Sequence, residues 1–320
     1  MIETYTRAQL EKVMQPEEVI KAVEEGFIAY SQGKTVIPPV GELIFDDPRG
    51  DCHIKYGFRK GEPTFTIKIA TGFSANAELG ISTSNGVILV FSSKTGQLTN
   101  ILQDEGFLTN IRTSAAGAVV AKLLAPKKVS CIGIIGAGIQ GKLQLDYLRY
   151  VQPTRRAMIF DQIRERAQTY AVDGFEIQVA TSVAEVAANC NLIVTTTPSR
   201  KWYLGASDVR PGTHITAIGA DGEGKQELDP QLFTKAAVRV VDSRKQCVRA
   251  GDSSYALKQG LIQLEDLIEL GELAQDPSLG RRNDTDITIA DLQGVAIQDI
   301  QVAQLAVNAM AGRDAVTANC

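Results

Sequence analysis

The chain has 320 residues, of which 44% are hydrophobic and 22% charged, and its formal net charge is −4. This composition is typical of a globular protein with one large or two medium domains, and the slightly acidic charge argues against a nucleic-acid partner. No apolar segment is long enough to cross a bilayer and the first residues lack the pattern of a signal peptide, so we expect a cytoplasmic protein without membrane contact.

The cysteines and histidines do not indicate a metal centre. The five cysteines are scattered along the chain, and the only histidines are His53 and His214. Metal sites and disulfide frameworks need clustered or regularly spaced side chains, which this pattern does not offer. We therefore expect no bound metal and reduced thiols.

Two helices frame the first part of the chain. Apolar residues recur at helical spacing over 7–33, just before the helix-breaking Pro38-Pro39. A second helix is predicted over 104–124, with small residues along one side, and Pro126 ends it. Small residues on one side of a helix allow close packing against a neighbouring element.

Between these helices the sequence predicts strands and turns. The clearest strands are 54–58, 64–70 and 86–91, and the last leads into a hairpin-turn sequence at 92–96. The alternation of apolar residues in 65–69 predicts a sheet with one polar face, and Lys68 lies on that face.

Residues 127–240 alternate strands with helices, which predicts a doubly wound parallel sheet. A polar stretch of helix and loop follows at 255–275, then a strand near 287–289 and a helix over 295–311 that returns to the first domain. We predict an α/β fold with a Rossmann domain at 121–294 and a discontinuous α+β domain at 1–120 and 295–320. The strands predicted for the Rossmann sheet are 129–135, 156–160, 176–179, 192–196, 213–218 and 237–241.

The strand at 129–135 runs into a glycine-rich turn with the spacing of a dinucleotide site. Gly136 permits a tight turn, Gly138 lets the backbone approach a pyrophosphate, and Gly141 allows close helix–strand packing. Asp161 ends the next strand and can accept hydrogen bonds from the adenosine ribose. Its carboxylate favours NAD over NADP, although arginines at 164 and 166 keep NADP as an alternative.

Further residues could carry chemistry, and each also has a simpler interpretation. Lys68 lies among apolar strand residues but could be an ordinary sheet-surface lysine. Arg112 near a helix start could grip a carboxylate or phosphate, or form a surface ion pair. Asp221 follows a predicted strand, where ligands of such sheets bind, but could belong to a plain acidic loop. The segment 291–299 could approach a cofactor or simply begin a helix.

Taken together, these motifs resemble the ornithine cyclodeaminase and mu-crystallin family over nearly the whole chain. The resemblance implies a Rossmann domain, a second domain at 1–120 and 295–320 that binds substrate and forms the interface of a homodimer, and NAD(H) or NADP(H) chemistry at a carbon bearing an amino group. The segments that carry it are Thr66-Ile67-Lys68, Leu108-Thr109-x-x-Arg112-Thr113-x-Ala115-Ala116, the glycine loop, Gly219-Ala220-Asp221-x-x-Gly224-Lys225-x-Glu227-Leu228 and Gly294-x-Ala296-x-Gln298-Asp299.

The resemblance also implies roles for single residues. Lys68 corresponds to a lysine that binds the substrate carboxylate, Arg112 to an arginine between substrate and cofactor phosphate, and Asp221 to an acid/base carboxylate. We take these three as the catalytic residues. The predicted cofactor-binding positions are Thr83, Ser84, Arg112, Thr113, Gly136, Ala137, Gly138, Ile139, Gln140, Gly141, Asp161, Thr195, Thr196, Ala217, Ile218, Gly219, Lys225 and Gly294.

One position departs from the family pattern. Many members carry an arginine just after the paired prolines, where it grips the substrate carboxylate, whereas this chain continues Val40-Gly41-Glu42. His53 and Lys55 are the candidate replacements, because residues two apart on a strand point to the same face. The simpler interpretation is that they form hydrogen bonds on a sheet surface.

These inferences predict an NAD(H)-dependent oxidoreductase that reduces a small imino acid to an L-amino acid. Iminosuccinate, reduced to L-aspartate, is the leading example, because cations beyond Lys68 could hold a second carboxylate. Alanine dehydrogenase and ornithine or lysine cyclodeaminase are the alternatives within the family. A non-catalytic NAD(P)H-binding protein resembling mu-crystallin is the alternative of another class.

Overall fold

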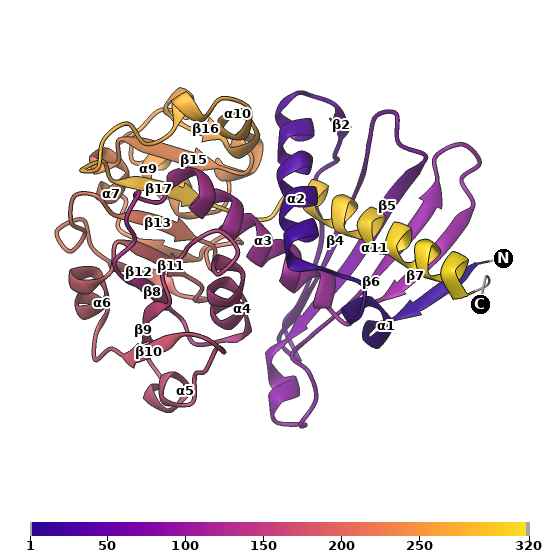
Figure 1. Ribbon diagram of the computed structural model, residues 1–320, viewed down its shortest axis with the longest axis horizontal. Coiled ribbons are helices and arrows are strands. Elements are labelled where there is room, and N and C mark those ends of the chain that lie inside the picture. Colours follow the sequence, from indigo (N-terminus) through magenta and orange to yellow (C-terminus); the bar gives the residue numbers. More distant parts are fainter. Residues whose placement is uncertain (1, 318–320) are drawn as a thin grey trace. The chain divides into compact units, whose positions relative to one another are not determined.

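The computed structural model describes residues 2–317 and divides into two compact units (Figure 1). The first comprises Met1–Arg112 and Ala296–Cys320, and the second comprises Thr113–Val295. The first boundary lies inside helix α3 (Phe107–Leu124), and the second lies just before helix α11 (Ala296–Thr317). The sequence places these boundaries after residues 120 and 294.

The described residues of the first unit form a seven-stranded sheet in the order β1-β7-β6-β5-β4-β2, with β3 also paired to β4. β1 runs parallel to β7 and the other pairs are antiparallel. The three predicted strands are parts of β4, β5 and β6, whereas the other four were not predicted. The strands are β1 (Glu3–Thr6), β2 (Thr35–Val36), β3 (Gly41–Phe45), β4 (Gly50–Arg59), β5 (Thr64–Phe73), β6 (Ser84–Ser92) and β7 (Leu98–Gln103), with a 3-10 turn η1 (Ser74–Ala77) after β5.

The single helix predicted over 7–33 is wrong, since the structure has α1 (Arg7–Glu11) and α2 (Pro16–Ser31) there. Pro16 occupies the first turn of α2, where its missing N–H is not needed and its fixed φ favours a new helix start. In Figure 1 the C-terminal α11 lies beside α2 and along the strands of this sheet, and it packs on β4 and β5.

The two faces of this sheet differ in burial. Thr66 and Lys68 lie on the face that α11 covers and are only 3% and 2% exposed. Phe65, Ile67 and Ile69 point to the opposite face and are only partly buried. Lys68 is therefore on the more polar face, as predicted, but this face is the interior one. The interpretation of Lys68 as a sheet-surface residue is wrong.

The second unit is an α/β unit built on an eight-stranded parallel sheet, in the order β10-β9-β8-β11-β13-β17-β15-β16. This confirms the predicted doubly wound fold. β12 (Arg200–Leu204) and β14 (Gln226–Leu228) form a separate pair that was not predicted. The strands of the large sheet are β8 (Ile132–Ile135), β9 (Arg156–Phe160), β10 (Glu176–Val179), β11 (Leu192–Thr195), β13 (His214–Ala217), β15 (Val238–Val241), β16 (Ile268–Glu269) and β17 (Thr288–Asp291).

The chain order of this sheet locates its ligand crevice. From β8 the chain continues to β9 and β10 on one side, and then returns to β11 and β13 on the other. Ligands of such sheets bind beyond the carboxyl ends of the strands at this switch point. The helices of the unit, besides part of α3, are α4 (Ile139–Leu148), α5 (Arg164–Gln168), α6 (Val183–Asn189), α7 (Gln231–Lys235), α8 (Arg244–Cys247), α9 (Asp252–Lys258) and α10 (Leu270–Gln275), with 3-10 turns η2 (Leu264–Asp266) and η3 (Pro277–Leu279).

Candidate functional site

The glycine-rich turn between β8 and α4 has the geometry of a dinucleotide loop. Gly136 has a φ of +110°, and a Cβ there would come within 2.6 Å of Thr196 Oγ1. A Cβ on Gly141 would lie 2.1 Å from the Gly136 carbonyl oxygen, so the helix packs tightly on the turn. A Cβ on Gly138 would meet nothing within 4 Å. The backbone at the start of α4 is therefore open to a phosphate group.

Asp161 is fixed beside this turn by two backbone hydrogen bonds. Its Oδ2 accepts from Ala137 N at 2.8 Å, and its Oδ1 accepts from Ile163 N at 2.8 Å. The carboxylate is thereby held at the end of β9, next to the loop. Because a fixed negative charge there repels a ribose 2′-phosphate, the residues present fit NAD better than NADP.

The remaining predicted cofactor positions divide between the two units. Thr195, Thr196 and the stretch 217–219 lie at the carboxyl ends of β11 and β13, and Gly294 follows β17. Thr113 in α3, Ile139 and Gln140 in α4, and Lys225 in the loop after β13 belong to the same unit. Thr83, Ser84 and Arg112 belong to the first unit, so their approach to a cofactor remains a prediction.

Glu227 connects the loops that follow β11 and β13, a role that the sequence did not reveal. One carboxylate oxygen accepts from Thr197 N at 2.6 Å, and the other accepts from Gly219 N at 2.8 Å. The hydroxyls of Thr195, Thr197 and Tyr203 donate to the same carboxylate. The only sequence signal was the position of Glu227 in a family motif.

Two further buried acids, Asp252 and Asp291, lie in the same region, and Asp252 interacts with both Glu227 and Asp291. Asp252 Oδ1 accepts from the backbone N–H groups of Glu227 and Leu228, at 2.7 and 2.8 Å. Asp291 Oδ2 accepts from Ser253 N at 2.8 Å. Burial raises the pKa of Glu227, Asp252 and Asp291, and the charge of Asp291 raises the pKa of Asp252 further. The contacts of these acids are with N–H and O–H groups, which fix loops in place.

Asp221, the predicted acid/base residue, lies on the loop beyond β13. Its side chain is 56% exposed and forms an ion pair of 2.5 Å with Lys225. An exposed carboxylate beyond the end of a central strand is free to meet a ligand, and exchange of Lys225 for another cation costs little at this exposure.

In the first unit, Lys68 and Arg112 converge on one buried carboxylate. Lys68 Nζ lies 2.9 Å and Arg112 Nε 3.1 Å from Asp299 Oδ1, while Arg112 Nη1 donates to Gln298 Oε1 at 2.6 Å. β5, α3 and α11 supply these side chains. The interpretation of Arg112 as a surface ion pair is wrong, because its contacts are buried. Asp299 was not predicted as a site residue, although its motif was recognised.

The electrostatics of this cluster favour an anionic ligand. The pKa of Lys68 is lowered to about 7, chiefly by burial and also by the charges of Arg112 and Lys55, while Asp299 acts in the opposite direction. Burial alone would raise the pKa of Asp299, but Lys68 and Arg112 outweigh burial and lower it. Asp299 is therefore ionised while two cations share it, and the surplus positive charge can be neutralised by a carboxylate.

Of the two predicted replacements for the missing arginine, Lys55 lies at this cluster. Lys55 pairs in register with Lys68, so it lies beside Lys68 on the neighbouring strand. His53 instead lies 3.4 Å from Asp51 and 3.7 Å from Glu42. Sequence reasoning also missed Asp104, whose charge interacts with Lys68 and whose Oδ1 is buried without a hydrogen-bond partner among the described residues.

Residues 2–317 contain neither a membrane-spanning helix nor a cluster of metal ligands. None of the described helices is long and apolar enough to cross a membrane. In the same range, no group of three or more His, Cys, Asp or Glu residues is arranged to hold a metal ion.

The chain is similar to known NAD-dependent enzymes that act on amino or imino acids. Alanine dehydrogenase of Archaeoglobus fulgidus is 37% identical over 304 residues, which cover 94% of this chain and 92% of the relative. The solved archaeal alanine dehydrogenase dimer with bound NAD superposes with a TM-score of 0.90 at 33% identity, covering 98% and 97% of the chains. Iminosuccinate reductase of Paracoccus denitrificans with NAD⁺ gives a TM-score of 0.89 at 28% identity, also over 98% and 97%.

The family model for ornithine cyclodeaminase and mu-crystallin matches residues 1–313, almost the entire sequence. The match includes the glycine loop, the Lys68 and Arg112 segments and the Asp221 loop. The chain therefore belongs to the ornithine cyclodeaminase/mu-crystallin family.

Proposed function

We propose that this protein is an NAD(H)-dependent oxidoreductase that acts on the CH–NH₂ or C=NH carbon of a small amino or imino acid. The observation that carries the proposal is the buried pair of cations, Lys68 and Arg112, that shares the single carboxylate of Asp299. The glycine loop and Asp161 support NAD as the coenzyme. We place the enzyme in the cytoplasm, in keeping with its free cysteines at 52, 131, 190 and 247.

In the reductive direction, Lys68 and Arg112 position the substrate, whereas Asp221 stabilises charge. Bound NADH supplies the hydride. Lys68 and Arg112 bind the substrate carboxylate and so fix the position of the α-carbon, which can lower the barrier by several kcal/mol, up to about 7–11 in the best intramolecular cases. Asp221 stabilises the positive charge of the protonated imine. In the oxidative direction Asp221 accepts the amine proton and then activates water.

Asp221→Asn tests this assignment. We expect turnover to fall by about 10²–10⁴ because general acid–base catalysis is lost, while NADH binding stays nearly unchanged. Glu223→Gln is the matched control, since Glu223 is an exposed acid on the same loop. Steady-state rates and a fluorescence titration with NADH give both values. Full activity of the Asp221→Asn variant contradicts the role.

Lys55 bears on the choice of substrate. It adds a third cation on the strand next to Lys68, where the side chain of an amino acid could carry a second carboxylate. This favours iminosuccinate, reduced to L-aspartate, as the substrate. Asp104 is the observation that favours the second candidate, a cyclodeaminase of ornithine or lysine, because a buried acid near Lys68 could hold a distal ammonium.

A rate comparison separates these candidates. NADH oxidation is measured with iminosuccinate, with ammonia plus oxaloacetate or pyruvate, and with other 2-oxo acids, while ammonia release from ornithine and lysine is measured with catalytic NAD⁺. We expect the highest kcat/KM for iminosuccinate. A preference for pyruvate with ammonia identifies an alanine dehydrogenase. Tight NADH binding without turnover on any compound contradicts the proposal and supports the non-catalytic alternative.

We also propose that the protein is a homodimer whose interface is the exposed face of the first unit's sheet. Strand register lines up Tyr56, Ile67, Leu89 and Ile101 across four strands on this face. All four remain partly or largely exposed, and a continuous apolar face of this kind indicates a protein partner. The archaeal alanine dehydrogenase is a dimer, which supports a second copy as that partner.

Ultracentrifugation of an Ile67→Glu variant tests the interface. A charge in the middle of the apolar face should dissociate the dimer, because its burial costs several kcal/mol. Thr95→Glu, on the exposed turn between β6 and β7, should leave the dimer intact. A monomeric wild-type protein, or a dimer that persists in the Ile67→Glu variant, contradicts this proposal.

A further inference from the structure

Two cysteines lie close together in the second unit, at the ends of the sheet strands opposite the glycine loop. Cys131 directly precedes β8, and Cys190 follows α6 just before β11. These strands are parallel neighbours, with Ile132 opposite Leu192 in register. Asn191 N donates to the Cys131 carbonyl oxygen at 3.3 Å, so the backbones are adjacent. Cys131 packs against the buried cluster that contains Cys190, and Cys190 Sγ lies 3.2 Å from where a Cβ on Gly133 would be, two residues beyond Cys131 in the chain.

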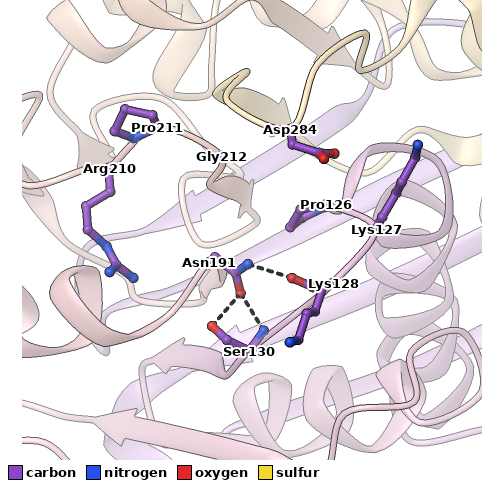
Figure 2. A pocket seen from close by; sticks show the side chains of 9 residues that line it. All are labelled: Pro126, Lys127, Lys128, Ser130, Asn191, Arg210, Pro211, Gly212 and Asp284. Atoms are coloured by element: carbon purple, nitrogen blue, oxygen red, sulfur yellow. Dashed lines mark hydrogen bonds between the residues drawn. The ribbon is translucent and has the colours of Figure 1, made fainter.

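The two thiols differ in access to solvent. Cys131 is partly exposed, whereas Cys190 is completely buried. Ser130 and Asn191, the chain neighbours of the two cysteines, line a cavity of about 590 Å³. Figure 2 shows Asn191 in this cavity, where its side chain bonds to Ser130 and to the Lys128 carbonyl oxygen. A small solute can therefore reach this end of the sheet, next to the chain neighbours of both cysteines, and of the two only Cys131 is partly exposed.

The two thiols also differ in reactivity. The hydrogen bond from Cys190 and the positive charge of Arg156 lower the pKa of Cys131, although burial opposes them. The hydrogen bond to Cys131 and burial raise the pKa of Cys190. The thiolate is the reactive form of cysteine, so Cys131 is the nucleophile of the pair and Cys190 stays protonated beside it.

We propose that Cys131 and Cys190 form a reversible oxidation site that reacts with peroxides. The Cys131 thiolate attacks one oxygen of hydrogen peroxide, the O–O bond breaks, and the products are a sulfenic acid and hydroxide. The Cys190 sulfur then attacks the Cys131 sulfur while its proton passes to the departing hydroxyl group, the S–O bond breaks, and water leaves as the disulfide forms. The peroxide is reduced by two electrons and the two thiols are oxidised by two.

The pairing has a protective consequence for Cys131. A sulfenic acid without a nearby thiol is oxidised further to sulfinic and sulfonic acids, which thiol reductants do not reverse. With Cys190 in contact, the disulfide forms first and a dithiol can reduce it again. Cys52 and Cys247 are buried single thiols, so we expect them to react slowly.

Mass spectrometry of the folded full-length protein after treatment with hydrogen peroxide tests the proposal. All samples carry Cys320→Ser, so that any disulfide that forms joins two cysteines whose positions the structure describes. We expect the loss of two hydrogen atoms, a Cys131–Cys190 cross-linked peptide, and recovery of both thiols with dithiothreitol. A disulfide between other cysteines, or unmodified thiols at a peroxide excess that oxidises the unfolded chain, overturns the proposal.

Single substitutions separate the roles of the two thiols. Cys190→Ala should accumulate sulfenic acid at Cys131, which dimedone traps, and then sulfinic acid. Cys131→Ser should leave Cys190 unmodified because it is buried, and Cys52→Ser should still form the disulfide. NADH binding shows that each variant is folded. Equal sulfinic acid at Cys131 in the wild-type protein and in Cys190→Ala contradicts a resolving role for Cys190.

Discussion

The two units each bury a polar centre, and the two centres are built in opposite ways. In the first unit, Lys68 and Arg112 share one carboxylate of Asp299, which leaves a surplus of positive charge. In the second unit, Glu227 is surrounded by N–H and O–H donors that satisfy both of its oxygens. A buried centre with unbalanced charge is suited to bind an ion, whereas a fully satisfied one fixes the backbone around it.

Removing the charge of the first centre should have the largest effect. In Lys68→Met we expect kcat/KM to fall by about 10²-fold or more, because the substrate carboxylate loses a ligand and the α-carbon is misplaced. Lys60→Met is the matched control, since Lys60 is exposed and its ammonium donates to the Gly33 carbonyl oxygen, outside the cluster of Lys68. Steady-state kinetics at saturating NADH measure both. A variant with wild-type kcat/KM shows that Lys68 is not part of the substrate site.

A change in the second centre should instead affect the coenzyme. Each Glu227 oxygen accepts one backbone N–H, from Thr197 and from Gly219, so the NH₂ group of a glutamine must face a donor in either orientation. A buried donor without a partner costs about 1–3 kcal/mol. We therefore expect Glu227→Gln to weaken NADH binding by about tenfold, with kcat at saturating NADH nearly unchanged.

Fluorescence titration with NADH measures this change, with Glu223→Gln as the control on the exposed part of the loop. A loss of kcat with unaltered NADH affinity assigns Glu227 to the substrate side and contradicts the contrast between the two centres.

The dependence on pH should also separate the two centres, and near pH 7 the change in kcat/KM should be small. Because the pKa of Lys68 is lowered to about 7, its ammonium is charged below this pH and neutral above it. Carboxylate binding needs the charged form, so we expect kcat/KM for the imino acid to decline as pH rises through about 7, approaching tenfold per pH unit.

Lys68→Arg supplies the control for this profile, because a guanidinium stays charged throughout the range. The decline near pH 7 should disappear in this variant, while NADH affinity remains flat in both proteins. An unchanged profile in Lys68→Arg assigns the titration to another group.

The parts of the site that depend on local sequence could be predicted from the sequence. Gly136, Gly141 and Asp161 follow from strand, turn and helix signals within one βαβ segment, and the structure places them accordingly. The partnership of Lys68 with Asp299 joins residues 231 positions apart, and neither periodicity nor composition indicates such a contact.

Burial of the sheet faces could not be predicted for a related reason. The alternation around Lys68 identified the polar face correctly, but the covering helix α11 comes from the other end of the chain. Glu227 was visible in a motif, yet its role depends on two loops that meet only in the folded unit. Sequence thus predicted the elements better than the pairs of elements that enclose each centre.

A crystal structure of the protein with NAD⁺ and its amino acid product tests the central claim most directly. We predict that the product carboxylate contacts Lys68 Nζ and the Arg112 guanidinium, with the Asp221 carboxylate within hydrogen-bond distance of the amino group. A product carboxylate bound away from both Lys68 and Arg112 contradicts the account.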